Sequence, residues 1–121
     1  MIEQEGVIEE ATLARQIAAI ASDTLASDIL VLDIQRVSSI ADYFVICSTD
    51  NPRQLRAVAD QIQEGLRDDG TRPERREGMP ETGWVVLDYG AVIVHLFTTE
   101  QREFYRLEDL WSDAQRLLVI Q

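Results

Sequence analysis

The chain has 121 residues, of which 45% are hydrophobic and 27% are charged, and this composition fits one globular domain rather than a disordered chain. Aspartate and glutamate number 22 against 11 basic residues, all of them arginine, so the net charge is -11. Nucleic acids and anionic membranes repel such a chain at long range, so the charge either serves solubility alone or favours a partner with a basic surface.

Three further features exclude whole classes of protein. The longest uncharged stretch, residues 89–99, is much shorter than the roughly 18–20 residues that span a bilayer. The first ten residues contain four glutamates and no basic residue, which predicts no targeting signal and a place in the cytosol, or in an organelle after processing. Cys47 is the only cysteine, so no intrachain disulfide is possible, and its apolar neighbours predict a small buried side chain.

Two helices are predicted in the first part of the chain. One covers residues 11–26, and the other runs from Pro52 to Leu66, with Asn51 as its N-cap and Gly70 as a left-handed stop. In both, apolar side chains recur at the three- and four-residue spacing of a buried helix face. These side chains are Leu13, Ile17 and Ile20 in the first helix and Leu55, Val58, Ala59, Ile62 and Leu66 in the second.

Two strands lie between these helices. Residues 29–34 and 43–47 are rich in β-branched and aromatic side chains, which favour extended structure. Because the connection between them is short, the two strands, with Leu32 and Ile34 on one and Val45 on the other, could pair antiparallel.

A hairpin is the clearest pattern in the sequence. Strands at 84–88 and 91–97 flank a predicted two-residue turn, Tyr89-Gly90, and residues 73–77 before them could add a charged edge strand. This register pairs Asp88 with Ala91, Val86 with Ile93 and Trp84 with His95, all on one face. It places Val85, Leu87, Val92 and Val94 on the other face. Both faces are apolar in the middle, as expected for a sheet covered by helices.

A last helix is predicted to open at Thr98, where Thr98 and Gln101 have the spacing of a capping box, and to run towards Trp111. The order of elements predicts an α/β fold, a mixed β-sheet of about five strands flanked by helices, in a single domain spanning the whole chain. Its core is expected at about residues 11–112, after a short acidic N-terminal extension. The apolar tail at 117–121 could pack on this core or on a second chain.

Catalytic motifs are absent from the sequence: it has no phosphate-binding glycine loop, dinucleotide fingerprint or nucleophile elbow. The only histidine, His95, is expected to be a stacked or hydrogen-bonded structural residue beside Trp84. Asp33 and Asp88, each near a strand end, could share a divalent ion. That possibility leaves a metal-dependent nucleotidyl transferase or phosphohydrolase as the alternative function.

Amphipathic aromatic residues set among acids are the most distinctive surface feature. Aromatic anchors ringed by charge are typical of a protein-binding patch, although each of these rings could instead fill the core. The aromatic residues are Trp84, Tyr89, Tyr105 and Trp111, and the acids are Glu81, Asp88, Glu103, Glu108 and Asp109.

Several long segments resemble one known family. The hairpin segments Trp84–Gly90 and Val92–Phe97, together with Ser39–Ser48 and Arg102–Trp111, are similar to the ribosomal silencing factor family (RsfS, also called Iojap). The resemblance covers about residues 13–111 and is much more specific than any short motif. Two departures occur: Asp50-Asn51-Pro52 replaces a small, serine-rich helix entry, and Ala91 stands where the family often has an aspartate.

The resemblance implies a non-enzymatic regulator without a cofactor or metal. Members of the family resemble nucleotidyltransferases in fold but lack the catalytic carboxylates. They bind the large ribosomal subunit through its ribosomal protein number fourteen, block association with the small subunit and repress translation. It further implies a cytoplasmic protein that forms a homodimer when free, and neither direct nucleic-acid binding nor membrane binding is expected.

The resemblance and the residue pattern together predict a partner-binding site. Trp84, Asp88 and Tyr89 are expected in the contact, with Glu77 and Glu81 as weaker acidic candidates. An acidic surface would be attracted to a basic ribosomal protein, and a few desolvated aromatic rings would supply the affinity. Ala91 removes one acid from this edge.

Overall fold

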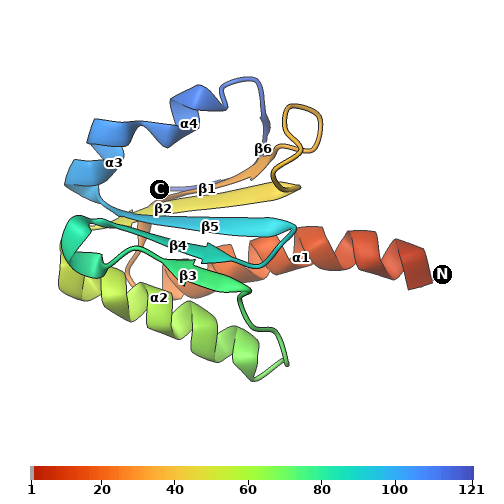
Figure 1. Ribbon diagram of the computed structural model, residues 1–121, viewed down its shortest axis with the longest axis horizontal. Coiled ribbons are helices and arrows are strands. Elements are labelled where there is room, and N and C mark those ends of the chain that lie inside the picture. The colour runs from red at the N-terminus through yellow and green to blue at the C-terminus, as the bar shows by residue number, and fades with distance from the viewer. Residues whose placement is uncertain (1) are drawn as a thin grey trace.

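The computed structural model describes the backbone of residues 2–121 and the side chains from Glu10 onward. Six strands form one mixed sheet in the order β3-β4-β5-β2-β1-β6, in which only the β2–β5 pair is parallel. Helices lie on both sides, α1 and α2 on one and α3 and α4 on the other (Figure 1). The elements are α1 (Ile2–Asp23), β1 (Ser27–Asp33), β2 (Tyr43–Thr49), α2 (Pro52–Arg67), β3 (Arg75–Glu77), the 3-10 helix η1 (Pro80–Thr82), β4 (Trp84–Asp88), β5 (Val92–Thr98), α3 (Thr99–Tyr105), α4 (Leu107–Leu110) and β6 (Gln115–Ile120).

The predicted α/β class with a mixed sheet is confirmed, but the sheet has six strands instead of about five. The additional strand is β6, which the apolar tail forms by pairing antiparallel with β1. The acidic start of the chain also departs from the prediction, because α1 begins at Ile2 instead of residue 11.

The helix caps of α2 follow the prediction closely. The side chain of Asn51 accepts a hydrogen bond from the Gln54 amide at 2.9 Å, and Pro52 occupies the first turn. The helix ends at Arg67, and Gly70 then takes the left-handed conformation with a φ of 84°.

The β1–β2 pair is antiparallel as predicted, and Leu32 lies opposite Phe44. The last helix differs from the prediction in one respect. Thr98 caps α3 as predicted, but the helix breaks at Arg106, whose φ is 48°, so the path to Trp111 is split into α3 and α4. The amide of Gln101 donates to the Thr98 hydroxyl at 3.4 Å.

The hairpin of β4 and β5 has its turn one residue later than predicted, on Gly90-Ala91. The amide of Tyr89 donates to the Val92 carbonyl, so Asp88 lies opposite Ile93. The register therefore shifts by two residues. Because side chains alternate with a period of two, the predicted division between the two faces is kept.

The sheet separates two hydrophobic clusters. The larger one lies under α1 and α2 and includes Val85, Leu87 and Cys47, all fully buried. The smaller one lies under α3 and α4 and is built around Phe44, Ile46 and Phe97. Cys47 is thus the buried apolar side chain that the sequence predicted, and burial raises the pKa of its thiol to about 12.

Candidate partner-binding surface

One part of the sheet lacks a helical cover on the α3–α4 side. Strand pairing aligns Glu77 with Val86 and Asp88 with Ile93, and alternation along β4 puts Trp84 on the same side. We call these five residues the open face. None of them is fully buried, whereas their neighbours Val85, Leu87, Val92 and Val94 on the opposite side have no exposed surface.

Trp84 sits at the border between the open face and the smaller cluster. Its ring lies 4.8 Å from Phe97 and 4.6 Å from Tyr105, measured between centroids. Its indole Nε1 donates to Nδ1 of His95 at 3.3 Å, although the cross-strand partner of Trp84 is Phe97. The prediction that His95 is a structural residue bound to Trp84 is therefore confirmed.

His95 is held neutral by its surroundings. Burial lowers the pKa of His95 to about 4, and because Nδ1 accepts from Trp84, the ring proton sits on Nε2. The Phe44 ring approaches edge-on at 4.7 Å. A neutral, enclosed imidazole fixes the orientation of Trp84 and is unsuited to acid–base chemistry near neutral pH.

The aromatic surface continues beyond Trp84 onto α3. Tyr105 packs against Trp84, and Phe104 packs edge-on against Tyr105 at 5.0 Å while 74% of its own surface stays exposed. Leu110 on α4 is 75% exposed. Neither Phe104 nor Leu110 was among the predicted contact residues, because their exposure follows from the break between α3 and α4 at Arg106, which has no signal in the sequence.

Arg102 anchors α3 to the sheet. This side chain is buried; its Nε donates to Glu108 Oε2 at 3.1 Å, and its Nη1 donates to the Asp28 carbonyl and to the Ser48 hydroxyl. It lines a cavity of about 490 Å³ at the ends of β1 and β2. A charged group bonded to three elements holds the helix, and hence Tyr105, in place over the sheet.

Asp88 belongs to the open face but already has local partners. Its Oδ1 accepts from the Gly90 amide at 2.8 Å, which stabilises the turn, and its Oδ2 accepts from Arg75 at 3.2 Å. Glu77 is exposed and forms no ion pair within the described part of the chain. Of these two acids, only Glu77 is free of an ion pair in the described part of the chain.

Tyr89 and Glu81 do not share the open face. Tyr89 packs against the larger cluster and lines a separate cavity of about 710 Å³ beside α1, and burial raises the pKa of its hydroxyl to about 12. Glu81 in η1 pairs with Arg56 of α2 at 2.6 Å. Of the predicted site residues, the structure therefore brings together Trp84, Asp88 and Glu77. It adds Val86 and Ile93 to this surface. Tyr89 and Glu81 lie outside the open face.

The two aspartates of the alternative metal site are far apart. Asp33 ends β1 and Asp88 ends β4, and strands β2 and β5 lie between them. Three strand spacings amount to roughly 14 Å, too far for two carboxylates to bind one ion. No group of three metal-binding side chains occurs among the described residues, and none of the helices described there is long and apolar enough to cross a membrane.

Comparison with known proteins identifies the family. The profile of the family described as "Ribosomal silencing factor during starvation" matches residues 7–120. The chain belongs to the RsfS family. The ribosomal silencing factor RsfS of Bacillus subtilis is 41% identical over 97 residues, which cover 80% of this chain and 82% of that protein. The chloroplastic protein Iojap of Arabidopsis thaliana is 29% identical over 90% of this chain and 45% of its own length.

Solved structures agree with this assignment. A crystal structure of a protein from Chromobacterium violaceum superimposes with a TM-score of 0.77 at 30% identity, covering 86% of this chain and 84% of the other. One from Bacillus halodurans gives a TM-score of 0.71 at 31% identity, covering 85% and 93%. The predicted RsfS resemblance is therefore confirmed, and with it a regulatory role in ribosome silencing.

Proposed function

We propose that this RsfS protein binds the large ribosomal subunit through its ribosomal protein number fourteen, prevents joining of the small subunit and thereby represses translation. The open face carries the proposal, because it combines half-buried apolar side chains with acids at its rim. Family membership supplies the ribosome as the target.

The chemistry of the open face suits a basic protein surface. Apolar surface that a partner could desolvate is provided by Trp84, Val86 and Ile93. Glu77 is exposed and could form an ion pair with a cation of the partner. In protein interfaces a few desolvated aromatic residues supply most of the affinity, whereas charges at the rim set orientation and speed encounter. A net charge of -11 adds long-range attraction to a basic partner.

Steric exclusion then explains silencing without chemistry. A chain of 121 residues forms a body roughly 30 Å across, which cannot share a tight contact between the two subunits. We place Trp84, Asp88 and Glu77 in the contact. Tyr89 and Glu81 are close to these residues in sequence, and we place them beside the contact. We also propose that the protein acts in the cytoplasm and is a homodimer when free, a state for which the family resemblance is the support.

The test compares two tryptophan variants. Both Trp84 and Trp111 are half-buried and pack against the smaller cluster, but only Trp84 belongs to the open face. Trp84→Ala should weaken co-sedimentation with large subunits by about 2 kcal/mol, or roughly 30-fold, while Trp111→Ala should stay near wild type. The control is circular dichroism, which should show that both variants are folded.

Subunit joining gives the functional measurement. Adding the wild-type protein to purified subunits should reduce the joined fraction in a sucrose gradient, and Trp84→Ala should need a much higher concentration for the same effect. The proposal is wrong if joining proceeds normally with the wild-type protein in excess. The placement of Trp84 alone is wrong if the folded Trp84→Ala variant binds as tightly as wild type.

A further inference from the structure

The arginines of this acidic protein are concentrated in one segment. Six of the eleven lie between Arg53 and Arg76, together with only five of the 22 acidic residues. This segment is therefore slightly positive, while the remainder of the chain carries a net charge of about -12. The segment comprises α2, the connection after it and most of β3.

Three of these arginines form a line along α2. Arg53, Arg56 and Arg67 are all exposed, and their spacing of three and eleven residues puts them on one side of the helix. Arg76 on β3 reaches the same side, where it bonds Asp60 at 2.9 Å and Gln63 at 2.6 Å. We call Arg53, Arg56, Arg67 and Arg76 the arginine stripe.

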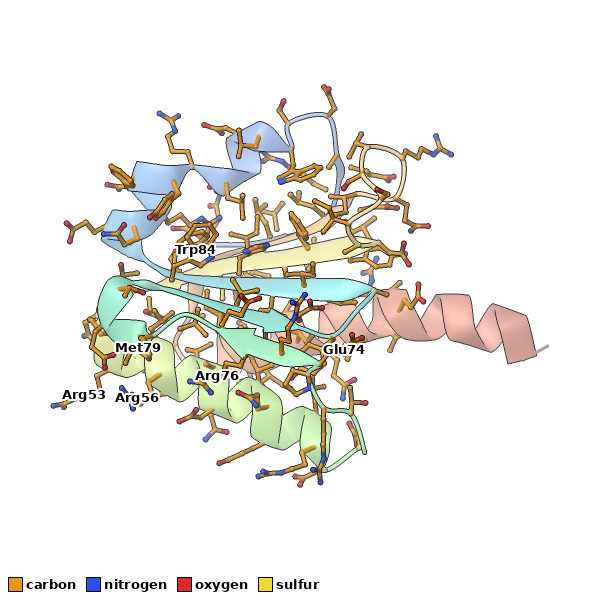
Figure 2. The ribbon with its side chains drawn as sticks, viewed as in Figure 1. Arg53, Arg56, Glu74, Arg76, Met79 and Trp84 are labelled. Carbon is orange, nitrogen blue, oxygen red and sulfur yellow. The ribbon has the colours of Figure 1, made fainter. Side chains whose placement is uncertain are left out.

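The stripe lies on the other side of the sheet from Trp84. Figure 2 shows Arg53, Arg56 and Arg76 along the side formed by α2 and β3, with Trp84 beyond the sheet. The two surfaces meet at the β3 edge, so one docked orientation can engage both. The first turn of α2 contains no acidic residue, so its positive dipole end adds to the charge of Arg53.

The acids within the stripe do not neutralise it permanently. Asp60 and Glu64 lie on the same side of α2, and Glu81 pairs with Arg56. The Arg56–Glu81 pair is largely exposed, with 57% of each side chain accessible, and the Arg76–Asp60 pair is partly exposed, with 30% and 51% accessible. Exposed pairs of this kind contribute little stability, so a stronger anion can replace the carboxylate.

We propose that the arginine stripe contacts the phosphate backbone of ribosomal RNA when the protein is bound to the large subunit. The inference rests on the proposed function, because that subunit brings the RNA close. An anionic protein beside RNA is repelled wherever its acidic surface faces phosphate, and the arginine stripe is the surface where this repulsion is least and guanidinium–phosphate bonds can form. The contact departs from the expectation of no direct nucleic-acid binding, which reflected net charge alone.

The test compares two triple variants with equal charge changes. Arg53→Gln, Arg56→Gln and Arg67→Gln remove the α2 part of the stripe, and the control carries Arg15→Gln, Arg36→Gln and Arg116→Gln, which are exposed arginines elsewhere. Binding to purified large subunits is measured by co-sedimentation at increasing salt. A second measurement uses isolated ribosomal protein number fourteen without RNA.

The stripe variant should bind the subunit about tenfold more weakly at 0.1 M salt, and its plot of log affinity against log salt should be flatter by about 2, since each lost phosphate contact accounts for roughly 0.7–0.9. The control should keep the wild-type slope. Both triple variants should bind the isolated ribosomal protein equally well and no more weakly than wild type, because their charge changes are the same.

The outcomes separate the two proposals. If the wild-type protein does not bind the subunit, the proposed function and this inference both fail. If it binds and the two triple variants show the same salt slope, only the inference fails. A stripe variant that loses affinity for the isolated ribosomal protein also overturns the inference, because it assigns the stripe to a protein contact.

Discussion

The two faces of the sheet are built from alternate residues of the same strands, yet they differ in almost every physical property. The face under α1 and α2 is closed: Val85 and Leu87 of β4 and Val92 and Val94 of β5 are fully buried there. The face under α3 and α4 is covered only in part, and at β4 it carries polar side chains among apolar ones.

The difference follows from the size of the covering helices. The helices α1 and α2 have 22 and 16 residues, long enough to cross the sheet, whereas α3 and α4 have 7 and 4. Two short helices held by Arg102 cover β4 only at its Trp84 end, through Tyr105, so the rest of this edge of the sheet has no helix over it. One face thus holds the larger hydrophobic cluster, and the other holds the smaller cluster and leaves part of its surface exposed.

The sharpest test of this division uses two adjacent valines. Val85 is fully buried on the closed face, while Val86 is half-buried on the open face and packs into neither cluster. Val85→Ala should lower the free energy of unfolding by about 2.5 kcal/mol, because it removes two buried carbon atoms and leaves a cavity. Val86→Ala should cost less than about 1 kcal/mol, measured by urea denaturation of both variants.

Binding should show the opposite order. At a temperature where both variants are folded, Val86→Ala should weaken association with the large subunit, and Val85→Ala should bind nearly as the wild type does. Equal losses of stability for the two valines would contradict the division into a closed and an open face.

The free energy of unfolding should depend on pH through His95, which is buried on the α3–α4 side of the sheet. The unfolded chain protonates His95 near pH 6.5, but burial holds its pKa at about 4 in the folded state. The difference between these two pKa values contributes to the free energy of unfolding. The contribution is present above pH 6.5 and is lost as the pH falls towards 4, because the unfolded state then binds a proton that the folded state does not. Between pH 7 and pH 5 the loss should be about 2 kcal/mol.

His95→Gln isolates this contribution, since glutamine keeps an acceptor for the Trp84 indole and does not titrate. Carboxylates protonate in both proteins, so the quantity to compare is the difference between the two pH profiles of unfolding free energy. Parallel profiles from pH 7 to pH 5 would show that His95 is not buried in the neutral form.

The closed face could be predicted from sequence far better than the open one. Alternation along β4 and β5 identified both faces even though the register was wrong by two residues, because an even shift preserves which side each residue faces. The turn itself was misplaced by one residue. The Gly90 amide donates a hydrogen bond to the Asp88 carboxylate in the observed turn, and this bond depends on a side-chain conformation that composition does not reveal.

Other features depend on tertiary structure. The break at Arg106 has no sequence signal, since arginine is not typical of left-handed conformations, and the burial of Arg102 requires carbonyl and hydroxyl partners from β1 and β2. All five predicted site residues came from one short segment of the sequence, so Tyr89 and Glu81 were grouped with Trp84 although they do not share its surface. Neighbours along a turn and a hairpin face different sides, so sequence proximity was a poor guide to a shared surface.

A smaller effect is expected when the hydrogen bond between Trp84 and His95 is removed alone. Trp84→Phe keeps an aromatic ring against Phe97 and Tyr105 but loses the indole donor. We expect a loss of about 1 kcal/mol in unfolding free energy and a clearly smaller loss of subunit affinity than for Trp84→Ala. If Trp84→Phe binds as poorly as the alanine variant, the contact depends on the indole nitrogen and not on the apolar ring.

The smallest expected change in stability concerns the ion pair at the rim of the open face. Arg75 is 69% exposed and donates to Asp88 Oδ2, while the other oxygen of Asp88 remains bonded to the Gly90 amide. Arg75→Gln should therefore change the free energy of unfolding by less than about 0.5 kcal/mol. Unlike Trp84→Ala and Val86→Ala, it should strengthen binding, because it frees a carboxylate oxygen and removes a cation that repels a basic partner. We expect about twofold faster association with the large subunit at low salt and no difference at high salt, where such charges are screened. Slower association of the Arg75→Gln variant at low salt would show that the partner presents negative charge to this rim, and that Asp88 lies outside the contact.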